Sequence, residues 1–274
     1  MPTLKTGLIQ MRSGTDPARN LSDATGFIRE AAGQGAQLVC TPETTHLVQK
    51  DANALFDVIR TPEDDPAIPA FAKLAEELGI WLLIGSLALK IGDWRAVNRS
   101  FLFAPDGSTA ATYDKIHMFD VGLGAGETYS ESTNYRPGSK AVLTEAGPAR
   151  LGLTICYDLR FAYLYRRLAQ AGANVIAAPS AFTVPTGRAH WETLIRARAI
   201  ETGSWLIAPA QGGQHEDGRK TWGHSLVVDP WGGIAAVLDH DEPGVLMAEI
   251  DLGKSANARE RIPSLSHDRE ITGP

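Results

Sequence analysis

The chain has 274 residues, of which 43% are hydrophobic and 21% charged, and its formal net charge is −6. This composition is typical of a globular protein with enough apolar residues for a core, and it excludes a disordered chain. Acidic and basic residues are interspersed, which argues against a nucleic-acid-binding protein.

Strands and helices are expected to alternate along the chain. Apolar runs predict strands over residues 5–11, 37–40, 81–85, 97–103, 108–113, 149–156, 174–178, 205–210, 224–228, 234–238 and 245–250. Apolar residues at spacings of three and four predict helices over 16–33, 66–79, 162–171 and 190–202. The polar, Gly-rich stretch 120–139 is expected to be a functional or mobile loop. The pattern predicts an α/β fold with layered, mixed sheets.

No membrane anchor or secretion signal is predicted. No apolar run approaches the ~20 residues of a transmembrane helix, and MPTLKTGLIQM lacks the charged and apolar regions of a signal peptide. We therefore expect a cytoplasmic protein in which Cys40 and Cys156 form no disulfide. Without a linker or repeat, we expect one domain over 1–274, with a polar C-terminal arm from about residue 261.

Three polar residues follow predicted strands and turns: Glu43, Lys115 and Cys156. A thiol at the end of a strand is a candidate nucleophile. A carboxylate in a dry pocket can accept the thiol proton, and an ammonium can stabilise a thiolate or an oxyanion. Each residue alone is a weak signal, because Glu43 and Lys115 also fit solvated strand ends and cysteines are often plain core residues.

The three contexts together resemble the nitrilase (carbon–nitrogen hydrolase) superfamily. The matching motifs are TPET around Glu43, YDKIHMFD around Lys115 and GLTICYDLRF around Cys156, in the order of that family's Glu-Lys-Cys triad. The resemblance extends over nearly the whole chain. PSAFTVPTGRAHWETLIRARAIET and AQGGQHEDGRKTWGHSLVVDPWG look like the branch that contains deaminated glutathione amidase and omega-amidase.

The resemblance implies a four-layer α-β-β-α sandwich that assembles as a homodimer or a higher homo-oligomer. It implies a cysteine-dependent amidase that converts a small anionic carboxamide into a carboxylate and ammonia through a thioester, without metal or organic cofactor. Deaminated glutathione is the favoured substrate. The alternatives are an omega-amidase acting on alpha-ketoglutaramate and another aliphatic amidase or nitrilase.

The resemblance also assigns roles to residues around the triad. ESTNYRPG places a second glutamate, which positions the lysine, at Glu131, and the backbone N–H of Tyr157 is the second oxyanion donor beside Lys115. An anionic substrate needs a cation, for which Arg160 is the first candidate and Arg188 the second.

Two further residues, Phe182 and Thr186, match a pocket-lining segment of this branch. Tyr163 departs from the family pattern, because RFAYL stands here where relatives commonly have RFPEL or RFAEL. Substrate preference is the property that this departure puts in question.

Other classes of function fit the sequence poorly. The seven histidines form no zinc-ligand pair at helical spacing. GLGAG at 122–126 lacks the βαβ frame of a dinucleotide loop, and the G-x-S-x-G motif of serine hydrolases is absent. A non-catalytic binding module would not need the three triad residues.

Overall fold

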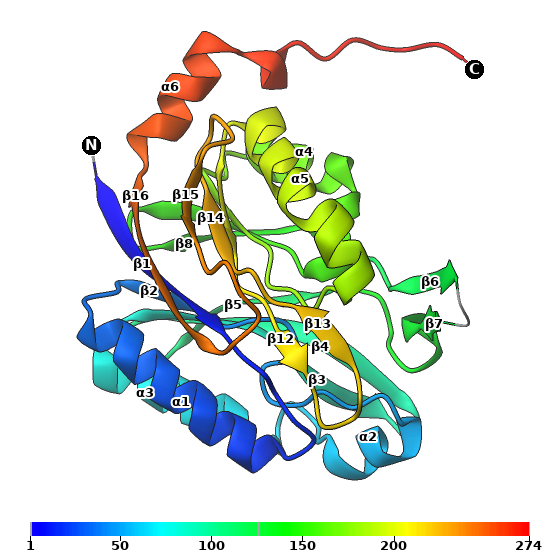
Figure 1. Ribbon diagram of the computed structural model, residues 1–274. Helices are drawn as coiled ribbons and strands as arrows, with labels where there is room; N and C mark the ends of the chain where they lie inside the picture. Colours follow the sequence, from blue (N-terminus) through cyan, green and yellow to red (C-terminus); the bar gives the residue numbers. More distant parts are fainter. Residues whose placement is uncertain (1, 125–126, 274) are drawn as a thin grey trace.

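The computed structural model describes residues 2–124 and 127–273, and two six-stranded sheets dominate them (Figure 1). In spatial order the first sheet consists of β16 (Gly244–Asp251), β1 (Thr3–Gln10), β2 (Leu38–Cys40), β3 (Trp81–Gly92), β4 (Arg95–Phe103) and β5 (Thr109–Asp114). The second consists of β15 (Ile234–Val237), β14 (Leu226–Val228), β11 (Trp205–Ala208), β10 (Val175–Ala177), β9 (Ala149–Leu153) and β8 (Val142–Ala146). Both sheets are mixed, with parallel strands in the middle and antiparallel strands at the edges.

Helices cover the outer face of each sheet. Helices α1 (Pro17–Gly33) and α3 (Ala67–Leu78) pack on the first sheet through one buried apolar stripe each. Helices α4 (Ala162–Gln170) and α5 (Val184–Thr202) lie on the second (Figure 1). The ends of the helices follow local rules, since the Asp16 carboxylate caps the start of α1 and Gly79, at φ 62°, ends α3.

The core between the sheets joins these layers. Apolar side chains such as Leu8 and Leu83 from the first sheet belong to the same buried cluster as Leu151 and Leu206 from the second. Burying one face of each sheet against the other, and the opposite face under helices, gives the four-layer α-β-β-α sandwich. The expected fold class is confirmed.

The predicted strand 149–156 is too long by three residues. Strand β9 ends at Leu153, and the chain then turns into the short 3₁₀ helix η2 (Cys156–Arg160). The Asp158 side chain causes this early turn, because its carboxylate accepts the backbone N–H of Ile155 at 2.9 Å. Apolar patterning continues through Ile155 since that side chain is still buried.

Other differences concern short or polar elements, for which hydrophobic periodicity is a weak signal. Helix α5 begins six residues before the predicted start at 190, with a proline in its first turn. The stretch 120–139 contains a hairpin of β6 (Asp120–Gly124) and β7 (Glu127–Ser130), followed by η1 (Glu131–Thr133); residues 125 and 126 lie outside the described residues. Elements without a prediction are α2 (Ala52–Val58), β8, β12 (Gly212–Gln214), β13 (Lys220–Trp222) and α6 (Gly253–Arg261).

The C-terminal residues first pack against α4 and then extend into solvent. After α6, a turn of 3₁₀ helix (η3, Ser264–Ser266) is tied to α4, where Gln170 donates to the Leu265 carbonyl at 2.9 Å and Arg166 pairs with Asp268. The chain then extends away from the body (Figure 1), with Ile271 fully in solvent. The expectation of one domain with an arm from about residue 261 stays a prediction.

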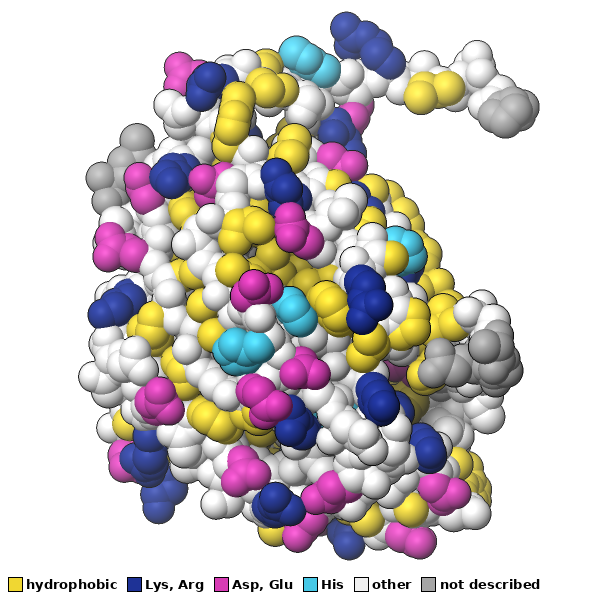
Figure 2. All heavy atoms as spheres, viewed as in Figure 1, with side chains coloured by type: hydrophobic (Ala, Val, Ile, Leu, Met, Phe, Trp, Pro, Cys, Tyr) yellow, Lys and Arg dark blue, Asp and Glu magenta, His cyan; other side chains and the backbone are white. Residues whose placement is uncertain are grey.

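The surface carries both signs of charge. Figure 2 shows Lys and Arg side chains intermingled with Asp and Glu over one face, as the interspersed sequence pattern predicts. Across the described residues, every helix is too short or too polar to traverse a bilayer.

A buried histidine joins the β12–β13 hairpin to the first sheet. The His215 side chain contacts the Ser13 carbonyl through Nδ1 at 2.8 Å and the Thr221 hydroxyl through Nε2 at 2.7 Å. Burial lowers the pKa of His215, so the neutral ring is the folded form at neutral pH.

We predict that His215 makes the folded state less stable in mild acid. The unfolded chain takes up a proton at this position at higher pH than the folded chain does, so unfolding becomes easier as pH falls below the ordinary histidine pKa of about 6.5. Urea unfolding at about pH 7.5 and about pH 5.5 should show a smaller loss of stability for His215→Gln than for the wild type. His267→Gln, at an exposed position, is the control; equal losses for all three proteins would contradict the prediction.

Candidate active site

Three loops bring Glu43, Lys115 and Cys156 together between the sheets. Glu43 follows β2 and Lys115 follows β5 in the first sheet, while Cys156 follows β9 in the second. The Lys115 Nζ lies 2.8 Å from Glu43 Oε1, and all three residues are less than 8% exposed. The structure thus assembles the predicted triad at the junction of the two sheets.

The predicted fourth residue, Glu131, lies on the other side of the lysine. Its carboxylate oxygens are 2.8 and 3.0 Å from Lys115 Nζ, and its Oε2 accepts the backbone N–H of Phe119 at 2.7 Å. Burial alone lowers the pKa of Lys115, but the negative charges of Glu131 and Glu43 outweigh it and raise that pKa well above its ordinary value. The lysine is therefore a permanent cation between two carboxylates.

The Cys156 thiol is protonated in this environment. Burial raises its pKa well above the ordinary value, and the charge of Glu43 raises it further, against a smaller opposing effect of Lys115. The residue also has a φ of +48°, a left-handed conformation that is unfavourable for a cysteine. Such strain at a turn is a feature of functional sites, where the surrounding structure has to hold it.

Glu43 is also held by residues that follow strands of the second sheet. The backbone N–H of Ala181, after β10, donates to Glu43 Oε2 at 3.0 Å. The Gln211 side chain donates to the Glu43 carbonyl at 3.0 Å, and Thr44 also has a positive φ, of 53°. These contacts hold Glu43 between Lys115 and the turn that contains Cys156.

Asn98 is a residue of the site that the sequence analysis missed. Its Nδ2 donates to Glu43 Oε1 at 2.9 Å and reaches Glu131 Oε1 at 3.4 Å, so it bridges the same two carboxylates as Lys115. Its Oδ1 is buried without a partner in the described part of the chain. An asparagine inside a strand gives no sequence signal of its own, although its alignment beside Lys115 is visible once β4 and β5 are paired.

A second group of residues, centred on Arg160, lies beside the turn that contains Cys156. The Arg160 guanidinium is centred 5.9 Å from the Tyr157 ring and 5.7 Å from the Phe182 ring, and it contacts His190 Nδ1 at 3.3 Å. Within residues 2–124 and 127–273, no carboxylate pairs with Arg160. The backbone N–H of Tyr157 likewise has no acceptor in those ranges.

The remaining two predicted binding residues are placed differently. Arg188 is exposed and lies over the Trp222 ring at 5.8 Å, apart from the aromatic contacts of Arg160. The Thr186 hydroxyl is buried and contacts Thr183 at the start of α5. Its hydrogen bonds therefore stabilise the beginning of that helix.

Comparison with known proteins identifies the family. The carbon-nitrogen hydrolase family profile matches residues 5–260. The chain belongs to the carbon-nitrogen hydrolase family. It is similar to human deaminated glutathione amidase, with 37% identity over 95% of this chain and 80% of that protein. It is also similar to omega-amidase NIT2 of Bos taurus, with 34% identity over 98% of this chain and 96% of that protein.

Solved structures share the fold of this chain. The C. elegans NitFhit protein matches this hydrolase with a TM-score of 0.91 and 35% identity, over 97% of this chain and 65% of that one. A mutant of an amidase from Nesterenkonia sp. AN1 matches with a TM-score of 0.80 and 25% identity, over 94% of each chain. In that amidase, the acetamide moiety of fluoroacetamide is attached covalently to the active-site cysteine.

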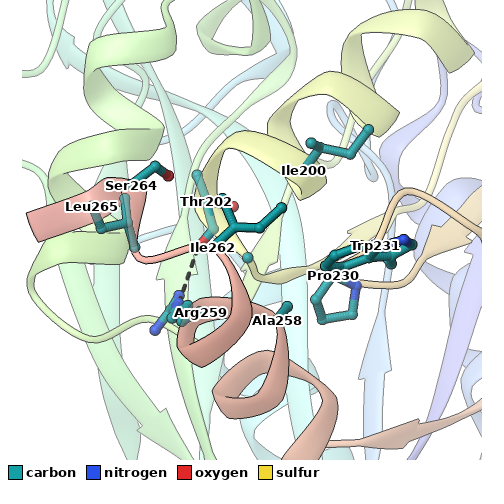
Figure 3. A pocket seen from close by; sticks show the side chains of 10 residues that line it. Ile200, Thr202, Pro230, Trp231, Ala258, Arg259, Ile262, Ser264 and Leu265 are labelled. Atoms are coloured by element: carbon teal, nitrogen blue, oxygen red, sulfur yellow. Dashed lines mark hydrogen bonds between the residues drawn. The ribbon is translucent and has the colours of Figure 1, made fainter. Parts of the chain in front are cut away.

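Two surface cavities of the hydrolase lie away from this site. One is formed by α5, α6 and the turn after β14, where Ile200, Trp231 and Ile262 surround it (Figure 3), and the second adjoins it at Pro230. Neither is lined by a predicted site residue. In the described ranges, no group of three His, Cys, Asp or Glu side chains is arranged to hold a metal ion.

We predict that Asn98→Leu, which keeps a similar volume but removes the amide donor, slows amide hydrolysis by this hydrolase by ~10- to 100-fold, the cost of losing hydrogen bonds to a charged group. The loss should appear in kcat rather than in KM, because Asn98 contacts the carboxylates and not the Arg160 group. Steady-state kinetics with a circular-dichroism check of folding measure it. An unchanged kcat in a folded variant would show that Lys115 alone holds the two carboxylates.

Proposed function

We propose that this hydrolase is a cysteine-dependent amidase whose preferred substrate is deaminated glutathione. The observation that carries the amidase proposal is the buried contact of Lys115 with Glu43 and Glu131 beside the Cys156 thiol. The substrate proposal is supported by the similarity to deaminated glutathione amidases and by Arg160, which has no carboxylate partner in residues 2–124 and 127–273.

In the proposed reaction, the Cys156 sulfur attacks the amide carbonyl while Glu43 accepts the thiol proton. The raised pKa of Cys156 makes this base necessary, since little thiolate forms unaided near neutral pH. The carbonyl oxygen becomes an oxyanion, which the Lys115 ammonium and the Tyr157 backbone N–H stabilise.

Collapse of this intermediate breaks the carbon–nitrogen bond. The leaving nitrogen takes the proton from Glu43 and departs as an amine or ammonia, which leaves an acyl thioester on Cys156. Glu43, again a carboxylate, removes a proton from water, whose oxygen attacks the thioester. The carboxylic acid product leaves and the thiol recovers its proton, so the cycle consumes one water and needs no cofactor.

Glu131 has a positioning role in this proposal. Its carboxylate holds Lys115 from the side opposite Glu43 and is itself fixed by the Phe119 N–H. A second anion also keeps the lysine protonated when Glu43 carries the thiol proton and is neutral.

Arg160 is proposed to bind the substrate carboxylate. Arg160 is partly buried, its guanidinium lies within 6 Å of the Tyr157 and Phe182 ring centroids, and it follows Cys156 by only a few residues. A guanidinium in such a place binds a carboxylate strongly because it has lost part of its hydration. Phe182 and Thr186 are proposed to line the pocket around it, and Arg188 to contribute positive charge further out.

The leaving group separates the two candidate substrates. Alpha-ketoglutaramate, the substrate of the omega-amidase alternative, is a primary carboxamide and releases ammonia, the product expected from the sequence. In deaminated glutathione the amide nitrogen belongs to a cysteinylglycine unit, so a dipeptide amine leaves. The similarity to omega-amidase NIT2 keeps the second activity as the alternative.

A homodimer or larger homo-oligomer and a cytoplasmic location are also proposed. The apolar surface around the cavity of Figure 3 supports self-association, because Ile200, Trp231 and Ile262 are each more than half exposed there. Exposed apolar groups gathered in this way are common at protein interfaces.

We predict that Cys156→Ala abolishes hydrolysis of both substrates while the fold is kept. Wild type and variant should be assayed side by side on deaminated glutathione and alpha-ketoglutaramate, with the released amine and ammonia measured separately. Wild type should be faster on deaminated glutathione. Turnover by the variant would refute the nucleophile, whereas equally poor wild-type rates on both substrates would refute only the substrate. Iodoacetamide should label wild type at Cys156, where Glu43 is placed to accept the thiol proton, and leave Cys40, which is 0% exposed and has no such base, unlabelled.

We further predict that Arg160→Met raises KM for both anionic substrates by ~10- to 100-fold, the cost of a lost charged hydrogen bond, with a smaller effect on kcat. Methionine keeps the apolar stem that packs on Phe182. Arg188→Met is the matched control and should change KM less, since Arg188 is exposed and lies over Trp222. A KM that is unchanged in Arg160→Met would place the carboxylate elsewhere.

A further inference from the structure

Tyr163, the residue that departs from the family pattern, makes an unexpected contact. Its side chain is 63% exposed, yet its hydroxyl lies 2.5 Å from Nε2 of His117. His117 is largely buried and stacks face to face on Phe161, with ring centroids 3.5 Å apart. A surface tyrosine is thereby connected to an interior ring.

The second nitrogen of His117 reaches a fully buried carboxylate. Nδ1 of His117 is 2.6 Å from Asp158 Oδ1, and the same oxygen accepts the His117 backbone N–H at 3.1 Å. The other oxygen of Asp158 accepts the Tyr113 hydroxyl at 2.6 Å and the Ile155 N–H at 2.9 Å. Burial raises the pKa of Tyr113, so its hydroxyl keeps the proton that it donates.

These contacts join the two halves of the catalytic machinery. Asp158 lies two residues after Cys156, and its bond to the Ile155 N–H holds the turn in which Cys156 adopts its strained conformation. His117 lies two residues after Lys115, in the segment that leaves β5. The contact between His117 and Asp158 therefore fixes the turn that contains Cys156 relative to Lys115.

We propose that Tyr163 is a positioning residue that donates its hydroxyl proton to Nε2 of His117. With Nε2 accepting from the hydroxyl, the ring proton lies on Nδ1 and points at Asp158, because a ring whose one nitrogen accepts has its proton on the other. The hydrogen bond, rather than the ring packing of Tyr163, is the functional contact. The inference rests on the proposed role of Cys156 as nucleophile.

Two substitutions separate the hydrogen bond from the ring packing. Tyr163→Phe keeps the edge contacts with Phe161 and His117 but removes the hydroxyl. Tyr163→Glu introduces the residue common in relatives and removes the ring. Its carboxylate accepts rather than donates, so it can hold the Nδ1 proton toward Asp158 only by binding a ring that carries protons on both nitrogens. Trp94→Phe is the control, since Trp94 is as exposed as Tyr163 and lies in the β3–β4 turn.

The measurements are the rate of Cys156 alkylation by iodoacetamide, kcat and KM for the better substrate, and the ¹⁵N resonance of His117 Nε2, assigned with His117→Gln. Tyr163→Phe should lower the alkylation rate and kcat by about fivefold, the loss expected for one hydrogen bond, with KM unchanged. It should also shift the His117 Nε2 resonance. Tyr163→Glu should recover most of both rates, and Trp94→Phe should match wild type.

The opposite ranking of the two Tyr163 variants would overturn the proposal. If Tyr163→Phe behaves as wild type and Tyr163→Glu is impaired, the ring packing is the functional contact. An unshifted Nε2 resonance in Tyr163→Phe would show that the hydrogen bond is absent in solution. The alkylation rate and the resonance require no turnover, so they decide this proposal even if the wild type hydrolyses neither amide.

Discussion

The site depends on one buried cation shared by two carboxylates. Lys115 is 2% exposed and lies within 3.0 Å of both Glu43 and Glu131. A buried ammonium is costly unless charges of opposite sign surround it, and two carboxylates would repel each other without a cation between them. The charges of the two carboxylates therefore keep the buried lysine in its charged form. The Asn98 amide adds a neutral donor to the same two carboxylates.

This cluster also acts on the Cys156 thiol. Burial is the main cause of the raised pKa of that thiol, and the charge of Glu43 raises the pKa further against a smaller opposing effect of Lys115, so the thiol stays protonated. In the proposed mechanism, the Glu43 carboxylate that disfavours the thiolate is also the group that accepts the thiol proton when a substrate carbonyl is present.

The four-layer fold supplies what the cluster requires. Glu43 and Lys115 follow strands of the first sheet, Glu131 lies in η1, and Cys156 follows a strand of the second sheet, so the distances between them depend on how the sheets pack. Contacts across the junction, such as the Ala181 N–H to Glu43 and His117 to Asp158, hold these segments in register. The strain at Cys156 persists because Asp158 holds the turn around it.

Much of this arrangement was predictable from the sequence, and the limits have physical reasons. Motifs around Glu43, Lys115 and Cys156 predict both fold and triad, because each motif encodes a turn as well as a reactive group. Asn98 was missed since its amide acquires a role only when β4 pairs with β5. Helix α6 and the β12–β13 hairpin are too polar or too short for a periodic signal.

The contact of Tyr163 with His117 was equally beyond sequence reasoning, because it joins residues 46 positions apart through the tertiary fold. The unusual tyrosine at position 163 was visible in the sequence motif, but its contact with His117 was not.

The protonation state of the resting thiol tests the central claim most directly. A thiolate absorbs in the ultraviolet where a thiol does not, so the difference in absorbance between wild type and Cys156→Ser reports thiolate at that position. If Lys115 is paired with Glu43 and Glu131 rather than with the sulfur, no thiolate band is expected from neutral pH to about pH 9. A full thiolate band at neutral pH would contradict the account, because it would mean that Lys115 is paired with the sulfur and that Glu43 is not needed to accept its proton.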